Sequence, residues 1–111
     1  MEFQTEELGP SSARLACSGR FNMTAAPDFR RYLDHVLETG AVRVVVDLTD
    51  TTFIDSSGLG ALIGGLKKAR QAGGDLRIAG APEQVQMVLG LTNLDRVLRP
   101  YADVAAATHG W

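Results

Sequence analysis

The segment "AVRVVVDL", residues 41–48, most strongly limits the folds open to this chain. It is β-branched and almost continuously apolar, which is typical of a strand that is buried on both faces. From Ser57 onward, apolar side chains recur at steps of three and four residues and predict an amphipathic helix. "DLRIAG", residues 75–80, then predicts another strand. Strands alternating with helices indicate a mixed or parallel sheet with helices packed against it.

The rest of the chain continues this alternation. Residues 2–8 and 12–18 predict two short strands, and in the second the apolar side chains fall at every other position. Thr24 is the expected N-cap of a first helix, which Gly40 ends. The remaining expected elements are a helix that begins at Pro82, a last short strand in "RVLRPY" (96–101) and a short helix in residues 102–111.

Length and composition narrow the class of protein. A chain of 111 residues without repeats or linkers predicts one domain, residues 1–111. The net charge of −2 and the scattered basic residues give no basic face for nucleic acid. No apolar run approaches the ~20 residues of a membrane span, and no signal pattern opens the chain. The single cysteine, Cys17, favours a reducing, cytoplasmic compartment and is expected to be a small buried residue.

The junction "FIDSSGLGALIGG", residues 53–65, places a carboxylate and two hydroxyls where the buried strand leads into the helix. Asp55, Ser56 or Ser57 is able to cap the helix, whose first N–H groups lack partners. Capping explains one polar residue well but not three together. A serine at a helix N-terminus is also well placed to carry phosphate, because the free N–H groups and the helix dipole favour negative charge. A regulatory phosphorylation site is therefore a second interpretation.

Catalytic interpretations of this junction are weaker. The serine-hydrolase turn needs glycine two positions before the nucleophile, and Ile54 stands there before Ser56. The two histidines, His35 and His109, are expected at the surface rather than as a catalytic base. "GLGALIGG" matches a dinucleotide-binding fingerprint only in part, and no Walker lysine pattern occurs. We therefore expect no enzyme activity.

A metal site is also not indicated. Asp47, Asp50 and Asp55 are close in sequence, but their spacing matches no magnesium-binding pattern, and solvated loop carboxylates are the simpler interpretation. We expect neither a metal nor a cofactor.

From Val42 to Leu98 the sequence resembles the STAS domain of bacterial anti-sigma factor antagonists. The resemblance rests on a buried strand, an Asp-Ser-Ser-Gly-Leu-Gly motif, a lysine-containing helix, Gly-Gly, a strand and a helix opened by proline. It is weaker over residues 2–41, although the elements follow in the right order. The resemblance implies an α/β fold with a mixed sheet of about four to five strands packed against about four helices.

The resemblance also implies a function. Such a protein, when unphosphorylated, binds an anti-sigma factor that is a serine kinase of the histidine-kinase-like ATPase superfamily, and so frees a sigma factor. The kinase phosphorylates the serine after the motif aspartate, here Ser56, and a PP2C-type phosphatase removes the phosphate. ATP and magnesium belong to the kinase, and the antagonist itself is expected to be a monomer. The residues expected to contact the partner are Asp55, Ser56, Ser57, Gly58, Leu59, Gly60 and Asn22.

One segment departs from the family pattern. Related chains often carry Gly-Glu-Leu/Ile-Asp after the second strand, whereas this chain has Gly19, Arg20, Phe21 and Asn22. A base replaces one acid and an amide replaces the other, and such a change at an interface rim redirects partner choice. An alternative function therefore stays open, that of a structural STAS module in a stress-signalling scaffold or a lipid-transport complex, without a phospho-switch.

Overall fold

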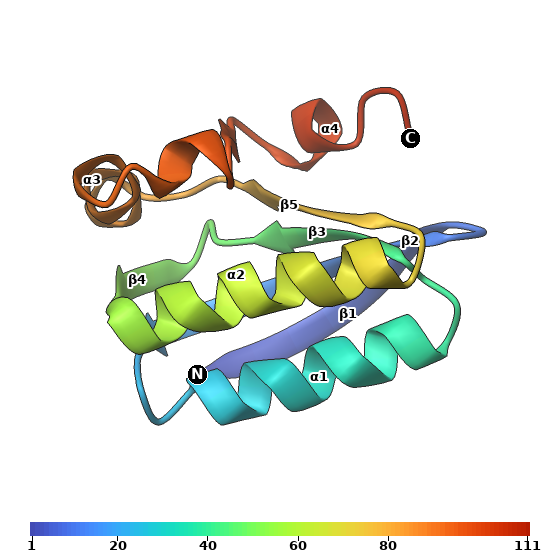
Figure 1. Cartoon of the computed structure of the whole chain (residues 1–111), viewed down its shortest axis with the longest axis horizontal. Helices are drawn as coiled ribbons and strands as arrows, with labels where there is room; N and C mark the ends of the chain where they lie inside the picture. The colour runs from blue at the N-terminus through green and yellow to red at the C-terminus, as the bar shows by residue number, and fades with distance from the viewer.

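The computed structural model describes all residues, 1–111, and its centre is a six-stranded mixed sheet (Figure 1). The strand order is β1-β2-β3-β5-β6, with β4 paired to β2. Only β1 and β2 pair antiparallel, and all other pairs are parallel. The strands are β1 (Glu2–Gly9), β2 (Ser12–Phe21), β3 (Arg43–Asp47), β4 (Thr51–Ile54), β5 (Asp75–Ala79) and β6 (Pro100–Tyr101).

The helices cover the sheet unequally. Two long helices, α1 (Ala26–Glu38) and α2 (Ser56–Gln71), lie side by side on one face of the sheet. The shorter α3 (Glu83–Leu91) packs against β4 at the end of the molecule where α2 begins, and α4 (Val104–Ala107) lies on β3, β5 and β6 (Figure 1). The predicted α/β fold class and single compact domain agree with this arrangement.

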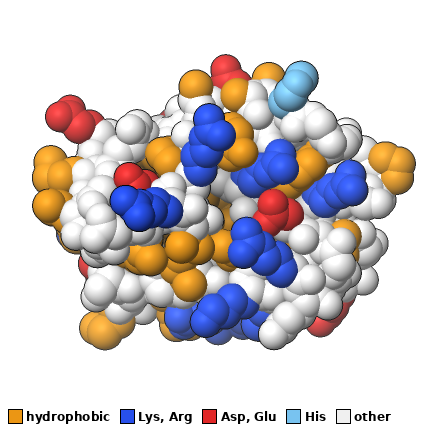
Figure 2. Space-filling model, turned by 45° about the horizontal axis from the view of Figure 1, so that its top comes forward, with side chains coloured by type: hydrophobic (Ala, Val, Ile, Leu, Met, Phe, Trp, Pro, Cys, Tyr) orange, Lys and Arg blue, Asp and Glu red, His pale blue; other side chains and the backbone are white.

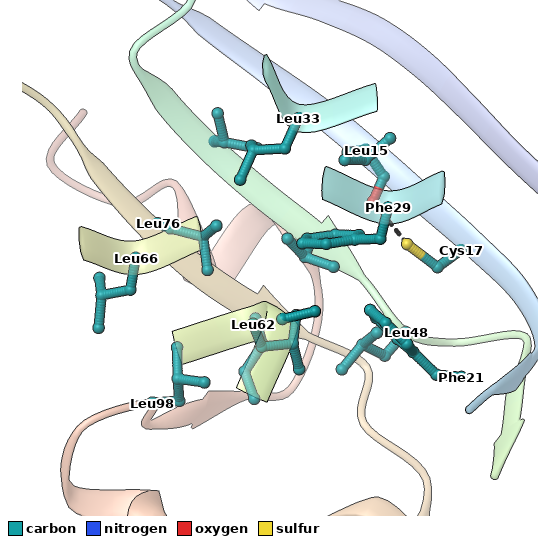
Figure 3. Packing of buried hydrophobic residues seen from close by; sticks show 14 of the residues in the cluster. Leu15, Cys17, Phe21, Phe29, Leu33, Leu48, Leu62, Leu66, Leu76 and Leu98 are labelled. Carbon is teal, nitrogen blue, oxygen red and sulfur yellow. Dashed lines mark hydrogen bonds between the residues drawn. The ribbon is translucent and has the colours of Figure 1, made fainter. Parts of the chain in front are cut away.

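The main core lies between the sheet and the α1–α2 layer (Figure 3). Leu15 and Cys17 of β2 face this core at alternate positions, as the sequence predicts. Phe29 of α1 and Leu62 of α2 project between the helices and the strands, and both are fully buried. Val45 of β3 is equally buried but belongs to a second apolar cluster. The prediction that this strand is buried on both faces is therefore confirmed.

The second apolar cluster lies under the C-terminal segment. Ala79 of β5 is buried there against Ala107 of α4. Arg77 donates a hydrogen bond to the carbonyl oxygen of Ala107 at 2.8 Å, and its guanidinium carbon lies 4.5 Å from the ring centre of Trp111. The last residues of the chain thus cover this part of the sheet.

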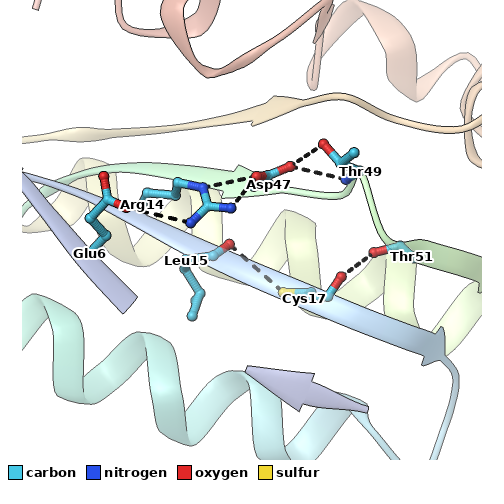
Figure 4. Close-up of polar contacts among 7 residues, drawn as sticks. All are labelled: Glu6, Arg14, Leu15, Cys17, Asp47, Thr49 and Thr51. Atoms are coloured by element: carbon cyan, nitrogen blue, oxygen red, sulfur yellow. Dashed lines mark hydrogen bonds and ion pairs between the residues drawn. The ribbon is translucent and has the colours of Figure 1, made fainter. Parts of the chain in front are cut away.

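The sequence did not predict β4. After Asp47 the chain leaves β2, turns through residues 48–50, and pairs again with Gly19–Phe21 at the end of β2. Thr51 is buried and its hydroxyl donates to the carbonyl oxygen of Cys17 at 2.7 Å, which holds the new strand in place (Figure 4). The buried strand that leads into α2 is therefore a short separate strand rather than the end of β3.

Two local predictions are wrong. Thr24 does not cap α1: the N-cap residue is Ala25, and the side chain of Asn22 instead accepts hydrogen bonds from the amides of Thr24 and Ala25, each at 3.1 Å. The segment 96–101 is a strand only at Pro100–Tyr101, because a 3-10 turn at Leu94–Arg96 occupies its start. The short strand still pairs parallel with β5.

Candidate functional site

The junction between β4 and α2 brings together four parts of the chain. β4 ends at Ile54, Asp55 follows, and Ser56 is the first residue of α2. The loop between β2 and α1 lies on one side of this junction and α3 on the other (Figure 1). Ser56 is exposed, and no hydrogen bond occupies its hydroxyl. The site is therefore an accessible serine at the N-terminus of a 16-residue helix.

Asp55 is the N-cap of α2. Its Oδ1 accepts a hydrogen bond from the amide of Gly58 at 2.9 Å, and its Oδ2 accepts one from the amide of Met23 at 3.1 Å. One carboxylate thus fixes both the first turn of α2 and the loop that precedes α1. Since the cap is Asp55, capping does not account for the hydroxyls of Ser56 and Ser57.

The two glycines of the motif have different surroundings. A Cβ on Gly58 would lie 2.2 Å from the carbonyl oxygen of Phe21, so α2 approaches β2 closely at this residue. A Cβ on Gly60 would meet nothing within 4 Å. Leu59, between them, is 5% exposed and belongs to the main core. Of the residues expected to contact a partner, Ser56 and Gly60 are exposed, Asp55 and Ser57 are half-buried, and Gly58 and Leu59 are buried.

The segment that departs from the family pattern lies beside β4. The guanidinium carbon of Arg20 lies 4.4 Å from the ring centre of Phe53, and Phe53 stands two residues before Asp55. Asn22 is half-buried and uses its side chain to shape the loop to α1. The structure therefore places Arg20 and Asn22 next to the serine junction rather than elsewhere on the surface.

Two residues at the site, Met23 and Gln84, were not expected from the sequence. Met23 is 73% exposed, and its amide is bound to Asp55, so an apolar side chain lies at the edge of the junction. Gln84 of α3 forms two hydrogen bonds with the backbone of Ile54. Neither residue belongs to a recognisable motif, and both contacts depend on the tertiary fold, so no local sequence signal was able to reveal them.

The other candidate groups lie apart from this junction. His35 and His109 are both exposed, as the sequence predicts. Cys17 is 1% exposed, and burial together with the negative charge of Asp47 raises the pKa of its thiol. No group of three or more His, Cys, Asp or Glu side chains is placed to hold a metal ion. Asp47 and Asp55 form hydrogen bonds with different residues and do not share a site.

Asp47 belongs to a polar network across β2 and β3 (Figure 4). Arg14 binds its Oδ2 through Nε at 2.9 Å and through Nη2 at 2.7 Å, and Thr49 binds its Oδ1 through the backbone amide at 3.0 Å. Burial by itself would raise the pKa of the Asp47 carboxyl, but the hydrogen bonds from Thr49 and Arg14 outweigh it and lower the pKa below its usual value. This network stabilises the fold and does not reach Ser56.

Comparison with known proteins decides the family. The family model described as "STAS domain" matches residues 9–107. This chain belongs to the STAS domain family. A protein of Thermotoga maritima, provisionally named an anti-sigma factor antagonist, is 33% identical over 87 residues, which are 78% of this chain and 77% of the relative. The anti-sigma-B factor antagonist of Bacillus subtilis is 28% identical over 93 residues, 84% of this chain and 81% of the relative.

Solved structures of this STAS group have the same fold. The crystal structure of an anti-sigma factor antagonist from Thermotoga maritima, also provisionally named, matches with a TM-score of 0.86 and 28% identity over 96% of this chain and 92% of that one. The Bacillus cell fate determinant SpoIIAA in its phosphorylated form matches with a TM-score of 0.73 and 17% identity over 97% of this chain and 98% of that one. The second likeness concerns the fold alone.

Two further observations concern nucleic acid and membranes as possible partners. On the face shown in Figure 2, Lys and Arg side chains lie in separate groups among acidic and apolar ones and do not form one basic surface. Among the helices, none combines the length and the apolar character that crossing a membrane requires.

Proposed function

We propose that this STAS domain is an anti-sigma factor antagonist that is switched off by phosphorylation of Ser56. When unphosphorylated it binds an anti-sigma factor that is also a serine kinase, and a sigma factor is released. The observation that carries the proposal is the position of Ser56, an exposed hydroxyl directly after the Asp55 cap at the start of α2. A kinase is able to reach this hydroxyl without unfolding the domain.

A phosphate on Ser56 would change the surface and preserve the fold. The N–H groups of the first turn of α2 and the helix dipole favour an anion at this end. The phosphate adds about −1.5 to −2 charges at neutral pH. It would stand beside the Asp55 carboxylate and the exposed Met23 side chain, where a partner surface would otherwise approach closely. We therefore expect phosphorylation to weaken partner binding through charge and bulk.

The remaining parts of the mechanism belong to the partners. In this proposal ATP and magnesium are bound by the kinase, which is of the histidine-kinase-like ATPase superfamily, and a PP2C-type phosphatase restores the hydroxyl. The antagonist is a cytoplasmic monomer, a regulatory protein rather than an enzyme, and it requires no cofactor.

The test is phosphopeptide mapping of the protein recovered from its native cells under growth, stationary and stress conditions. Ser56→Ala removes the proposed acceptor, and Ser57→Ala is the matched control because it removes the neighbouring hydroxyl. We expect phosphate on Ser56 in the wild type and in Ser57→Ala, and none in Ser56→Ala. The unphosphorylated protein is used to capture the anti-sigma factor. Purified phosphoprotein should then bind this anti-sigma factor more weakly than the Ser56→Ala variant does.

A second candidate function is a STAS module that assembles a larger complex without a phospho-switch. Arg20 and Asn22 beside the junction favour it, because a base and a neutral amide stand at the two positions where the resemblance leads us to expect acids. Absence of phosphate under every condition, together with stable capture of a partner other than an anti-sigma factor, would support this module and overturn the switch.

A further inference from the structure

Gln84 holds the strand that leads into Ser56. Its Oε1 accepts a hydrogen bond from the amide of Ile54 at 3.0 Å, and its Nε2 donates one to the carbonyl oxygen of Ile54 at 3.1 Å. A single amide side chain thus pairs with both backbone groups of one residue, as a neighbouring strand would. Ile54 is separated from Ser56 only by Asp55.

The geometry of β4 explains why Ile54 needs this partner. The amide of Asp55 points toward β2 and donates to the carbonyl oxygen of Phe21 at 3.2 Å. Successive residues of a strand turn their backbone groups to opposite sides, so the groups of Ile54 point away from β2, toward α3. Without Gln84 the amide and carbonyl of Ile54, whose side chain is 1% exposed, would lose their partners in the protein.

We propose that Gln84 is a positioning residue for Ser56, and this inference rests on the proposed phospho-switch. The junction is held on the β2 side by Phe21 and Met23, and on the opposite side by the side chain of Gln84. With both sides fixed, Ile54 and Asp55 set the direction in which α2 leaves the sheet. The helix α3 is thereby part of the site, although it contributes no residue to the motif around Ser56.

Gln86 provides a matched control on the same helix. Its Nε2 donates to the carbonyl oxygen of Ala81 at 2.8 Å, at the start of α3 and away from β4. Replacing either glutamine by methionine keeps the length of the side chain and a similar helix propensity, and removes only the polar amide. Gln84→Met and Gln86→Met therefore each remove side-chain hydrogen bonds from α3, but only Gln84→Met frees Ile54.

The first readout does not depend on any kinase. Amide hydrogen exchange is measured by NMR for Ile54, Asp55 and Ser57, with the core amide of Leu62 as the internal reference for global unfolding. We expect exchange at Ile54 to be about tenfold faster in Gln84→Met than in Gln86→Met, which is the size expected for loss of a hydrogen bond. Equal exchange at Ile54 in the two variants overturns the inference.

The second readout is phosphorylation of Ser56. Isotopically labelled variant and unlabelled wild type are mixed in one reaction with ATP and an extract of the native cells, so that the two proteins compete for the same kinase. The ratio of the two Ser56 phosphopeptides by mass spectrometry gives the relative kcat/KM. We expect a loss of threefold or more for Gln84→Met and no loss for Gln86→Met.

The outcomes separate the two proposals. Wild type that acquires no phosphate on Ser56 overturns the proposed switch, and the exchange measurement alone then decides whether Gln84 positions the junction. Efficient phosphorylation of wild type with equal rates for both variants keeps the switch and overturns the positioning role. The switch and the positioning role are both supported if Gln84→Met, but not Gln86→Met, shows faster exchange at Ile54 and slower phosphorylation of Ser56.

Discussion

The Cα of Gly58 packs directly on the carbonyl oxygen of Phe21, so closely that a Cβ at this position would lie 2.2 Å from that oxygen. Neither atom belongs to a flexible side chain, so Gly58→Ala must push α2 away from β2. We expect a loss of about 1–3 kcal/mol of stability, the usual cost of overpacking, measured by urea unfolding. Gly60→Ala is the matched control: its Cβ meets no atom, and alanine stabilises a helix by ~1 kcal/mol over glycine. Equal stability of the two variants would contradict the close packing.

Asp55 is expected to contribute more to stability than an ordinary helix cap. Asp55→Ala removes the acceptor for Gly58 and also the acceptor for Met23. Removing an N-cap costs about 0.5–2 kcal/mol, and the second hydrogen bond adds to this. Asp103→Ala is the control, because Asp103 caps the four-residue α4 through the amide of Ala106 alone. Thermal unfolding should show the larger loss for Asp55→Ala; an equal or smaller loss would mean that the contact with Met23 contributes nothing.

Acid should remove the contribution of Asp47 to stability. Its folded-state pKa lies below the value of ~3.9 expected for the unfolded chain, so the carboxylate stabilises the fold above that value, and the contribution is lost as pH falls through the folded pKa. We expect Asp47→Asn to cost about 1–3 kcal/mol at pH 7, with the difference from wild type shrinking as the pH falls below the unfolded-chain value of ~3.9. Urea unfolding across this range checks the expectation.

The control for Asp47 is Asp34→Asn. Asp34 pairs with Lys68 at 2.7 Å, but both side chains are nearly half exposed. Such surface pairs contribute ~0–1 kcal/mol, so this variant should follow wild type closely at every pH. A pH-independent difference between wild type and Asp47→Asn would show that the network with Arg14 acts through packing rather than through charge.

The thiol of Cys17 should be unreactive in the folded protein. Burial raises its pKa and keeps reagents away, so a thiol reagent at pH 8 is expected to react only through opening of the fold, at least ~100-fold more slowly than in denaturant. In a Cys17→Ala/Ser18→Cys double variant the thiol moves to a half-buried position on the other face of β2 and should react readily. Fast modification of native wild type would show that β2 opens locally.

The sequence predicts best those elements whose pattern is long or strongly periodic. The β-branched run of β3 and the helical stripe of α2 indicated the fold class, and the Asp-Ser-Ser motif predicted a helix cap that the structure places at Asp55, because both signals are local. β4 has only four residues, of which two are adjacent threonines, and its identity as a strand depends on pairing with β2. Local propensity carries no information about such pairing.

The incorrect prediction that Thr24 caps α1 has a similar cause. Thr24 has the chemistry of an N-cap, but α1 begins one residue later, after Ala25, and the amide of Thr24 is itself bound by Asn22. The loop that contains Asn22 is held by the hydrogen bond between Met23 and Asp55. That bond joins residues 32 positions apart. Gln84 was missed for the same reason, since its contacts with Ile54 span 30 positions.

The break between β3 and β4 separates the central sheet from the serine junction. The centre of the sheet is the fully buried run Val44–Val46, whereas the serine follows a four-residue strand that pairs with β2 only at the last residues of β2. The contacts that fix the junction are few and local: the pairing with β2, the cap formed by Asp55 and the side-chain amide of Gln84. Substitutions around the serine are therefore insulated from the central sheet, so the surface beside Ser56 can change while the scaffold stays intact.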